Sequence, residues 1–440
     1  MTLLARLATC GLLALAAPAM AESQFGCSEN QFSSAMPSVE GKDAVFFRTF
    51  ADLRLQHPMD ARVVEQLGRL ADVLRDNGTT LIYATIPAKS QAMPDFLPDD
   101  AAGYGYDRAI AEAVYDDITT RLNAAGVVAP DLMRALQASP PDDHPFFRAD
   151  FHWTSSGARL AAKAIGDAIK ADPAYADVTP ATYKSVEIGM KPAFSTMRRA
   201  LQGFCVDALP SVETMGFTTA LVEDATAEAG TLDIFGDTAG TAKIVLVGTS
   251  FSDSDVNNFS GFLQEYSGLE VINQAITGGN QFGAITSYLT SADFAEQRPR
   301  FLIWENPIYN NLGQYGPGQL EELIAAVGDT CSVTLDAVAD GDAGLVADLG
   351  THQLGPEDAI FADFGAESAR SATFTLDGPD GLIRRATVDR GDRLRATGRF
   401  YLGLSAFYVP GLHRVHVTFD RPVAEGAKIT LCLNEKGDAS

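Results

Sequence analysis

Apolar residues along the first three quarters of the chain alternate between helical spacing and short continuous runs. Residues 59–78 repeat at helical spacing and stop at Asn77-Gly78, which predicts a helix. The apolar run TTLIYATIP follows, and another helical stretch covers residues 108–126. Later apolar runs precede Gly248 and reach Trp304, with helical segments between them. This alternation predicts an α/β fold, a parallel sheet with helices on both faces.

The last strand of the sheet is expected at Phe301–Trp304, with a loop after it that carries Glu305, Asn306 and Tyr309.

Two regions depart from the alternation of helical segments and apolar runs. Residues 172–240 give the weakest pattern: MRRALQGFC and TMGFTTALVEDATAE are consistent with strands or a hairpin, which the pattern does not place. After residue 328 only short alternating segments remain, separated by Gly, Asp and Pro. Such segments predict a C-terminal β-sandwich domain of about 110 residues.

The first residues resemble a secretory signal peptide. Arg6 precedes an apolar run that ends in Ala19-Met20-Ala21, a cleavage-site pattern. The run is shorter than the roughly 20 residues that span a bilayer, which favours cleavage over a membrane anchor. The expected division is therefore a signal peptide over residues 1–21, an α/β domain over 22–328 and a β-sandwich over 329–440.

Charge narrows the possible partners. The formal net charge of the chain is −24, and such a surface repels nucleic acid and anionic lipid. An anionic polysaccharide would be repelled as well, unless a local basic site compensates.

The cysteines support export. Cys10 lies in the signal peptide, which leaves an even number of cysteines, as is usual in an oxidising compartment. Of the three possible pairings, Cys27–Cys205 with Cys331–Cys432 keeps each bridge within one domain. Free buried cysteines are the alternative. No C-x-x-C spacing and no metal-ligand cluster occurs, so neither a metal nor a cofactor is expected.

An acid and a histidine stand together in the run RADFHWTSSGARLAA. In an extended segment, residues two apart point to the same side, so Asp150 and His152 are expected to face one cavity. Asp150 would then orient His152 as a base. The candidate nucleophile is Ser250, on the turn after the apolar run KIVLVGT. The alternative is that Ser250 caps a helix and that Asp150 and His152 form a structural turn.

Further residues are candidates for binding. The backbone N–H of Ser250 and the loop that contains Gly279 and Asn280 are candidate oxyanion donors, although that loop is equally consistent with a tight turn. Tyr309 follows the last strand and is expected to line the cleft. Arg395 and Arg399 belong to a group of arginines near aromatic residues, which suits an acidic or hydroxyl-rich polymer. Solvated strand positions explain these arginines equally well.

Together, GTSFS and DFHWTSSGARLAA resemble the alginate O-acetyltransferase family of AlgX and AlgJ, whose catalytic domain is SGNH hydrolase-like. The resemblance covers nearly the whole chain after the signal peptide and includes a C-terminal carbohydrate-binding module of the AlgX branch. It implies that Ser250 is the nucleophile, His152 the base and Asp150 its partner, with Tyr309 as a site tyrosine. The acid–base pair precedes the serine, which implies a permuted arrangement.

The resemblance implies a periplasmic O-acetyltransferase that acts on an exopolysaccharide such as alginate. It takes acetyl from a partner protein of the same pathway and works beside proteins of an export complex. The net charge of −24 leaves another exopolysaccharide open. Two alternatives have other consequences: an acetylesterase with the same triad, and a non-catalytic scaffold of the export complex.

Overall fold

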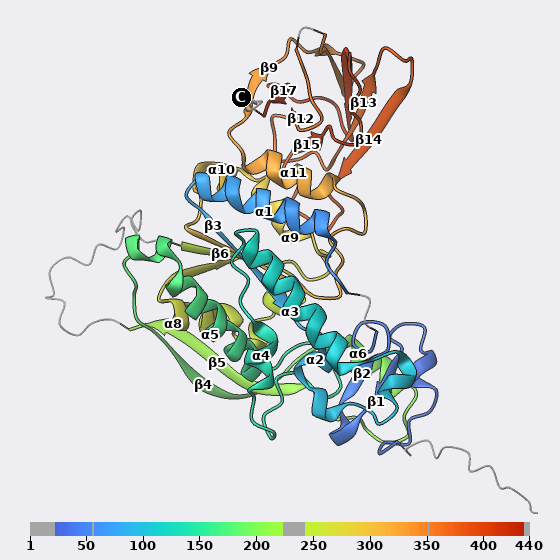
Figure 1. Cartoon of the computed structure of the whole chain (residues 1–440), viewed down its shortest axis with the longest axis vertical. Coiled ribbons are helices and arrows are strands. Elements are labelled where there is room, and N and C mark those ends of the chain that lie inside the picture. The colour runs from blue at the N-terminus through green and yellow to red at the C-terminus, as the bar shows by residue number, and fades with distance from the viewer. Residues whose placement is uncertain (1–22, 55–56, 223–242, 351, 435–440) are drawn as a thin grey trace, which may run out of the picture.

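The computed structural model describes residues 23–54, 57–222, 243–350 and 352–434, so the expected signal peptide lies outside the described residues. An α/β part occupies the lower two thirds of Figure 1 and an antiparallel β part the top, with the helices α10 (Ala292–Glu296) and α11 (Gly318–Val327) at the junction. Within the described ranges, every helix is too short or too polar to cross a membrane.

A parallel sheet of four strands forms the centre of the α/β part, in the order β3-β8-β6-β7. All residues of β3 and β8 are buried, because helices cover both faces of the sheet. Strands β3 and β8 pair in register from Thr80↔Phe301 to Ile86↔Pro307. The strands are β3 Thr80–Ile86, β8 Phe301–Pro307, β6 Lys243–Val247 and β7 Glu270–Asn273.

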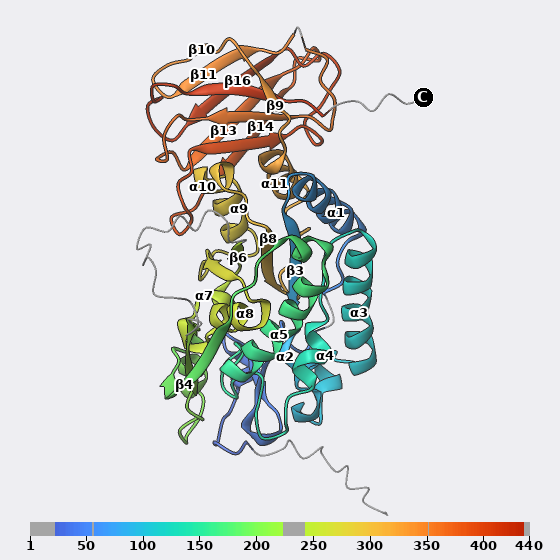
Figure 2. The same ribbon diagram turned by 90° about the vertical axis from the view of Figure 1, so that its left-hand side faces the viewer.

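Helices pack on each face, as the sequence predicted (Figure 2). One core joins Ile82 and Ile303 to residues of α5 and α8. The opposite core joins Tyr83 and Trp304 to residues of α1, α3 and α11. The helices are α1 Ala61–Asp76, α2 Lys89–Ala92, α3 Arg108–Ala124, α4 Leu132–Gln137, α5 Ser155–Ala171, α6 Thr196–Gln202, α7 Ser250–Asp253, α8 Phe259–Ser267, α9 Gly283–Leu289, α10 Ala292–Glu296 and α11 Gly318–Val327.

The expected end of the last strand at Trp304 was wrong. Strand β8 continues to Pro307, and Glu305 and Asn306 are 0% and 1% exposed rather than in a loop. Both polar side chains have partners inside the fold. Glu305 accepts hydrogen bonds from Thr249, and Asn306 donates one to the Tyr83 hydroxyl at 2.7 Å. Satisfied polar groups can be buried, so the strand has no reason to end before them.

Residues 172–240 contain a pair of antiparallel strands, as considered for TMGFTTAL, but MRRALQ forms a short helix instead of a strand. Strands β4 Tyr183–Pro192 and β5 Glu213–Leu221 pair antiparallel, and α6 lies between them in the chain. The part of this region from residue 223 onward falls outside the described residues. A smaller hairpin near the N-terminus pairs β1 Ser38–Glu40 with β2 Phe46–Arg48.

The C-terminal part is the predicted sandwich. It contains one sheet in the order β10-β11-β16-β13-β14 and another in the order β15-β12-β17-β9, around a common apolar core. Disulfide Cys331–Cys432 joins β9 to β17. The strands are β9 Cys331–Thr334, β10 Val338–Ala339, β11 Gly344–Asp348, β12 Ala359–Asp363, β13 Ser371–Asp377, β14 Ile383–Asp389, β15 Arg399–Gly403, β16 Arg414–Phe419 and β17 Lys428–Cys432.

Candidate active site

The stretch before α5 folds back on itself and presents the acid and the histidine together. Phe146 and Trp153 form an antiparallel bridge, and the His152 backbone N–H donates to Asp150 Oδ1 at 2.8 Å. This second bond closes a tight bend of the kind that Asp side chains stabilise. The two side chains do share one side, but a bend brings them there rather than the extended segment that was expected.

Lys89 fixes this bend from behind. Its Nζ lies 2.9 Å from the Asp150 carbonyl oxygen and 2.6 Å from that of Phe147. It also reaches the carbonyls of Phe46 and Arg148, both at 2.9 Å. The side chain is 1% exposed. Burial lowers the pKa of Lys89 to about 7, against the attraction of nearby carboxylates. One buried amine thus ties strand β2 to the loop that carries Asp150.

Ser250 begins α7 directly after strand β6, at the carboxyl end of the sheet. Glu305, at the end of the neighbouring strand β8, supports this turn. Its carboxylate accepts the Thr249 N–H at 2.8 Å and the Ser252 hydroxyl at 2.9 Å. A Cβ at Gly248 would overlap Glu305, so a side chain there would displace the carboxylate. Ser250 is therefore held between two residues that are bonded to the same buried acid.

The structure brings Ser250, His152 and Asp150 into one hydrogen-bonded row. Ser250 Oγ lies 2.8 Å from His152 Nε2, and His152 Nδ1 lies 2.6 Å from Asp150 Oδ1. The side chain of His152 is 22% exposed and that of Asp150 is 2% exposed. Burial raises the pKa of Asp150, but hydrogen bonds from His152 and Ser195 outweigh it, and the net shift is downward. The arrangement suits a hydroxyl nucleophile, a base and an ionised orienting acid.

Trp153 and Phe251 join the two sequence motifs. The Trp153 indole N–H donates to the Phe251 carbonyl at 2.9 Å. The Phe251 ring lies 4.9 Å from that of His152 and 5.4 Å from that of Trp153, measured between centroids. Because the residue after His152 bonds to the residue after Ser250, His152 and Ser250 keep a fixed spacing.

Tyr309 lies in a row of stacked groups that ends at the histidine. The Arg48 guanidinium carbon is 4.5 Å from the Tyr309 ring centroid and 4.3 Å from that of Phe151. The Phe151 ring in turn lies 4.0 Å from His152. Asp52 accepts hydrogen bonds from Arg48 at 3.0 and 3.1 Å, which fixes the cation. Burial raises the pKa of Tyr309 to about 12, so it remains a neutral phenol near neutral pH.

The loop that contains Gly279 and Asn280 lines a cleft of about 680 Å³ between the α/β part and the β-sandwich. The Gly279 N–H donates to Ile276 within a turn at 3.0 Å, so this donor is already engaged. Nearby, Thr277 N–H donates to Asp253 at 2.8 Å, which joins the loop to the end of α7. An oxyanion role for this loop stays a prediction, while its place beside the cleft is established.

Arg395 and Arg399 lie at the junction of the two parts. Arg395 pairs with Asp293 at 2.5 Å and with Glu367 at 3.1 Å. Arg399 donates to the Ser291 carbonyl at 3.4 Å. Their charges are thus directed at protein partners, and sugar binding by either residue stays a prediction. Arg393 also donates to a carbonyl, that of Thr277 at 3.5 Å, but its side chain lines the cleft and is exposed.

Sequence reasoning missed three supporting residues: Lys89, Ser195 and Glu305. Each is polar or charged, and each is less than 9% exposed and bonded to the loop of Asp150 or to the turn of Ser250. For Lys89 and Glu305 a signal existed, since each directly adjoins or ends an apolar strand run. No comparable signal marked Ser195.

A parallel α/β sheet with a hydrogen-bonded Ser–His–Asp row at the carboxyl ends of its strands defines an SGNH hydrolase-like protein. The family model described as "SGNH hydrolase-like domain, acetyltransferase AlgX" matches residues 39–308. Since this is more than half of the chain, the protein belongs to the AlgX family of SGNH hydrolase-like acetyltransferases, as the motifs predicted.

Individual relatives agree. The chain is 30% identical to the alginate biosynthesis protein AlgX of Pseudomonas aeruginosa over 278 residues, 63% of this chain but only 56% of that protein. It is 28% identical to AlgX of Pseudomonas putida over 82% of this chain and 77% of that protein. The solved structure of Pseudomonas aeruginosa AlgX superposes with a TM-score of 0.75 at 22% identity, over 93% of this chain and 97% of the other. That likeness shows a shared fold.

Proposed function

We propose that this protein is an O-acetyltransferase that passes acetyl groups through Ser250 to hydroxyls of a polysaccharide outside the cytoplasm. The observation that carries the proposal is the row Ser250–His152–Asp150, with contacts of 2.8 and 2.6 Å. The buried supports on both sides of this row agree with a site held in one geometry. A serine that merely capped a helix would need no base at hydrogen-bond distance.

In the first half-reaction, Ser250 Oγ attacks the carbonyl carbon of an acetyl donor while His152 Nε2 takes the hydroxyl proton. The bond from carbonyl carbon to leaving group then breaks, and the leaving group takes the proton from His152. Asp150 holds Nδ1–H and stabilises the imidazolium that forms between these events. The products are acetyl-Ser250 and the protonated leaving group.

In the second half-reaction, a sugar hydroxyl replaces the leaving group. His152 takes its proton, the sugar oxygen attacks the acetyl carbon, and Ser250 Oγ leaves with the proton from His152. The backbone N–H of Ser250 lies in the first turn of α7, where helix amides have no partner within the helix. It supports the negative charge on the acetyl oxygen in both steps.

The acceptor is proposed to be an exopolysaccharide of the alginate kind, because the relatives above are alginate biosynthesis proteins. The cleft beside Gly279 and Asn280 would hold it, with Tyr315 on its wall and Arg393 as a local cation in an acidic protein. Disulfides Cys27–Cys205 and Cys331–Cys432 support an oxidising compartment, and we place the protein in the periplasm. Its acetyl donor would be a protein of the same pathway, within an export complex.

The test is intact-mass spectrometry of the purified protein after brief exposure to p-nitrophenyl acetate. The wild-type protein should gain one acetyl group, while Ser250→Ala should gain none, because only the serine hydroxyl forms the ester. Acetylation of Ser250→Ala at the wild-type level would overturn the proposal. Adding polymer with and without acetyl groups then distinguishes the transferase from an esterase, which would release acetate instead of acetylating the polymer.

A further inference from the structure

Asp150 has a partner behind it that the triad chemistry does not include. The Ser195 hydroxyl lies 2.5 Å from Asp150 Oδ2, on the oxygen opposite the one that His152 uses. Both residues are buried, with Ser195 at 7% and Asp150 at 1% exposure. Each carboxylate oxygen thus has a donor, and the plane of the carboxylate is fixed from two directions.

The direction of the Ser195 proton follows from its place at the start of α6. Ser195 is the N-cap residue, and its Oγ accepts the Arg198 N–H at 2.9 Å. With that contact accepted, the remaining hydroxyl proton is directed to Asp150, which has none to give when ionised. Capping the helix and holding the acid are therefore two functions of one side chain.

Helix α6 is itself anchored at several points. Met197 and Leu201 are both 0% exposed and pack in a small core with Phe147 and Ala149, from the loop that carries Asp150. The Arg198 guanidinium donates to the carbonyls of Leu209 and Pro210 at 2.8 and 2.7 Å. The helix and the acid-bearing loop thus share one core.

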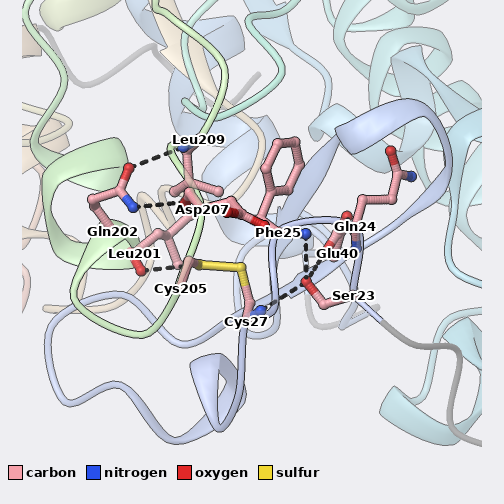
Figure 3. The surroundings of a disulfide bond; sticks show 10 residues. All are labelled: Ser23, Gln24, Phe25, Cys27, Glu40, Leu201, Gln202, Cys205, Asp207 and Leu209. Carbon is pink, nitrogen blue, oxygen red and sulfur yellow. Dashed lines mark hydrogen bonds between the residues drawn. A yellow bond between two sulfur atoms is a disulfide. The ribbon is translucent and has the colours of Figure 1, made fainter.

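A disulfide closes this assembly. Cys205 follows α6 by three residues and is bonded to Cys27 on the N-terminal arm, 178 residues away in sequence (Figure 3). Backbone bonds flank the bridge, from Ser28 N–H to the Phe204 carbonyl and from Val206 N–H to the Phe25 carbonyl. The arm therefore holds the end of α6 in place.

We propose that Ser195 is a positioning residue that orients Asp150 toward His152, and that α6 holds it there because disulfide Cys27–Cys205 anchors the helix. The inference rests on the proposed function, since it assigns Ser195 to the same triad. Without the Ser195 donor, Oδ2 is buried with one hydrogen bond fewer, and the carboxylate can rotate away from Nδ1 of His152. Lys89 cannot substitute, since its contact is with the Asp150 carbonyl.

The test compares the rate of Ser250 acetylation by p-nitrophenyl acetate in Ser195→Gly and Ser195→Thr. Glycine is nearly as good an N-cap as serine, so Ser195→Gly removes the donor while helix α6 is retained. Its rate should fall about tenfold to hundredfold, the usual effect of a lost hydrogen bond to a charged group. Ser195→Thr keeps the hydroxyl and should recover most of the rate.

A pH profile distinguishes positioning from simple destabilisation. Loss of the Ser195 bond raises the pKa of Asp150, so the acid-side decline of the acetylation rate should move to higher pH in Ser195→Gly and not in Ser195→Thr. The charged or titratable neighbours that face Asp150 are His152 and Lys89, and both are intact in each variant. Ser291→Gly is the matched control, because Ser291 is a buried N-cap of α10 that contacts no residue of the row.

The tether is tested with Cys27→Ser/Cys205→Ser, and Cys331→Ser/Cys432→Ser serves as the control. Cys27→Ser/Cys205→Ser should show a smaller fall in rate than Ser195→Gly, and its acid-side decline should also move to higher pH. Cys331→Ser/Cys432→Ser should show neither change. A wild-type rate and profile in Ser195→Gly would overturn the inference, and a wild-type rate in Cys27→Ser/Cys205→Ser would overturn the tether. Acetylation of Ser250→Ala would instead overturn the proposed function.

Discussion

At the residue scale, the turn that carries Ser250, the proposed nucleophile, depends on a buried acid outside the Ser250–His152–Asp150 row. Glu305 is 0% exposed and accepts bonds from Thr249 and Ser252, which flank Ser250 and Phe251 in the turn. Burial raises the pKa of Glu305 from 4.5 to about 7, although these donors oppose the shift. The folded protein therefore binds a proton more tightly at this site than the unfolded chain does.

The raised pKa of Glu305 makes the free energy of unfolding depend on pH. A carboxyl whose pKa is higher in the folded state contributes stability below its unfolded pKa, and loses it as pH rises through the folded pKa. Between pH 4.5 and about 7, Glu305 should therefore lower the free energy of unfolding as pH rises, by on the order of 2–3 kcal/mol. Urea unfolding of Glu305→Gln should lack this component, so its stability relative to wild type should improve with pH.

The exposed Glu296→Gln is the control for that experiment, because it changes the same chemical group on the surface. An equal pH dependence in wild type and Glu305→Gln would contradict the assignment. Acetylation of Ser250 should also slow in Glu305→Gln above a pH of about 7, where the wild-type side chain is a carboxylate, since an amide cannot accept all the bonds that hold the turn.

At the element scale, α5 approaches the acid-bearing loop through a glycine. The Thr154 side chain caps the helix, and Thr154 N–H donates to the Pro145 carbonyl at 3.0 Å. A Cβ at Gly157 would overlap that same carbonyl oxygen, which is backbone and cannot rotate away. Gly157 thus packs against the loop before Asp150.

Gly157→Ala should therefore destabilise the protein by about 1–3 kcal/mol, the usual cost of overpacking, and should slow acetylation because the loop must shift. Gly318→Ala is the matched control. Gly318 also lies in the first turn of a helix, and nothing lies within 4 Å of its added Cβ. That variant should be neutral or slightly more stable. Denaturant midpoints measure both, and equal midpoints for the two variants would contradict the argument.

Much of the fold and of the candidate site was predictable from local pattern. Periodicity placed the strands and helices of the α/β part, and i, i+2 spacing with a serine after a strand indicated Asp150, His152 and Ser250. Although Lys89 and Glu305 adjoin apolar runs, the partners of the supporting residues were not predictable, for a physical reason. Ser195 and Glu305 matter because they are buried against residues 45 and 56 positions away. A polar residue in a sequence gives no sign of which distant group will satisfy it.

At the scale of the whole molecule, a buried ion pair fastens the β-sandwich to the α/β part. Arg390 directly follows strand β14 of the sandwich, and Glu322 lies on α11. Their side chains are 2% and 7% exposed. Glu322 also accepts a bond from the Tyr401 N–H at 3.4 Å, on strand β15. Since the cleft proposed to hold the polymer lies along this junction, its width depends on how firmly the two parts are held.

Arg390→Leu should leave Glu322 buried without its cation, which costs about 3–5 kcal/mol when one partner of such a pair is removed. Calorimetry should show a lower midpoint, and the sandwich should unfold in a separate transition because its buried ion pair with α11 is lost. Arg384→Leu is the control, since Arg384 pairs with Asp380 four residues away within the sandwich, and its unfolding profile should stay near wild type.

The acetylation of Ser250 by p-nitrophenyl acetate should be largely retained in Arg390→Leu, whereas acetyl transfer to polymer should weaken through a higher KM. A single transition at the wild-type midpoint would show that the junction does not rest on this pair.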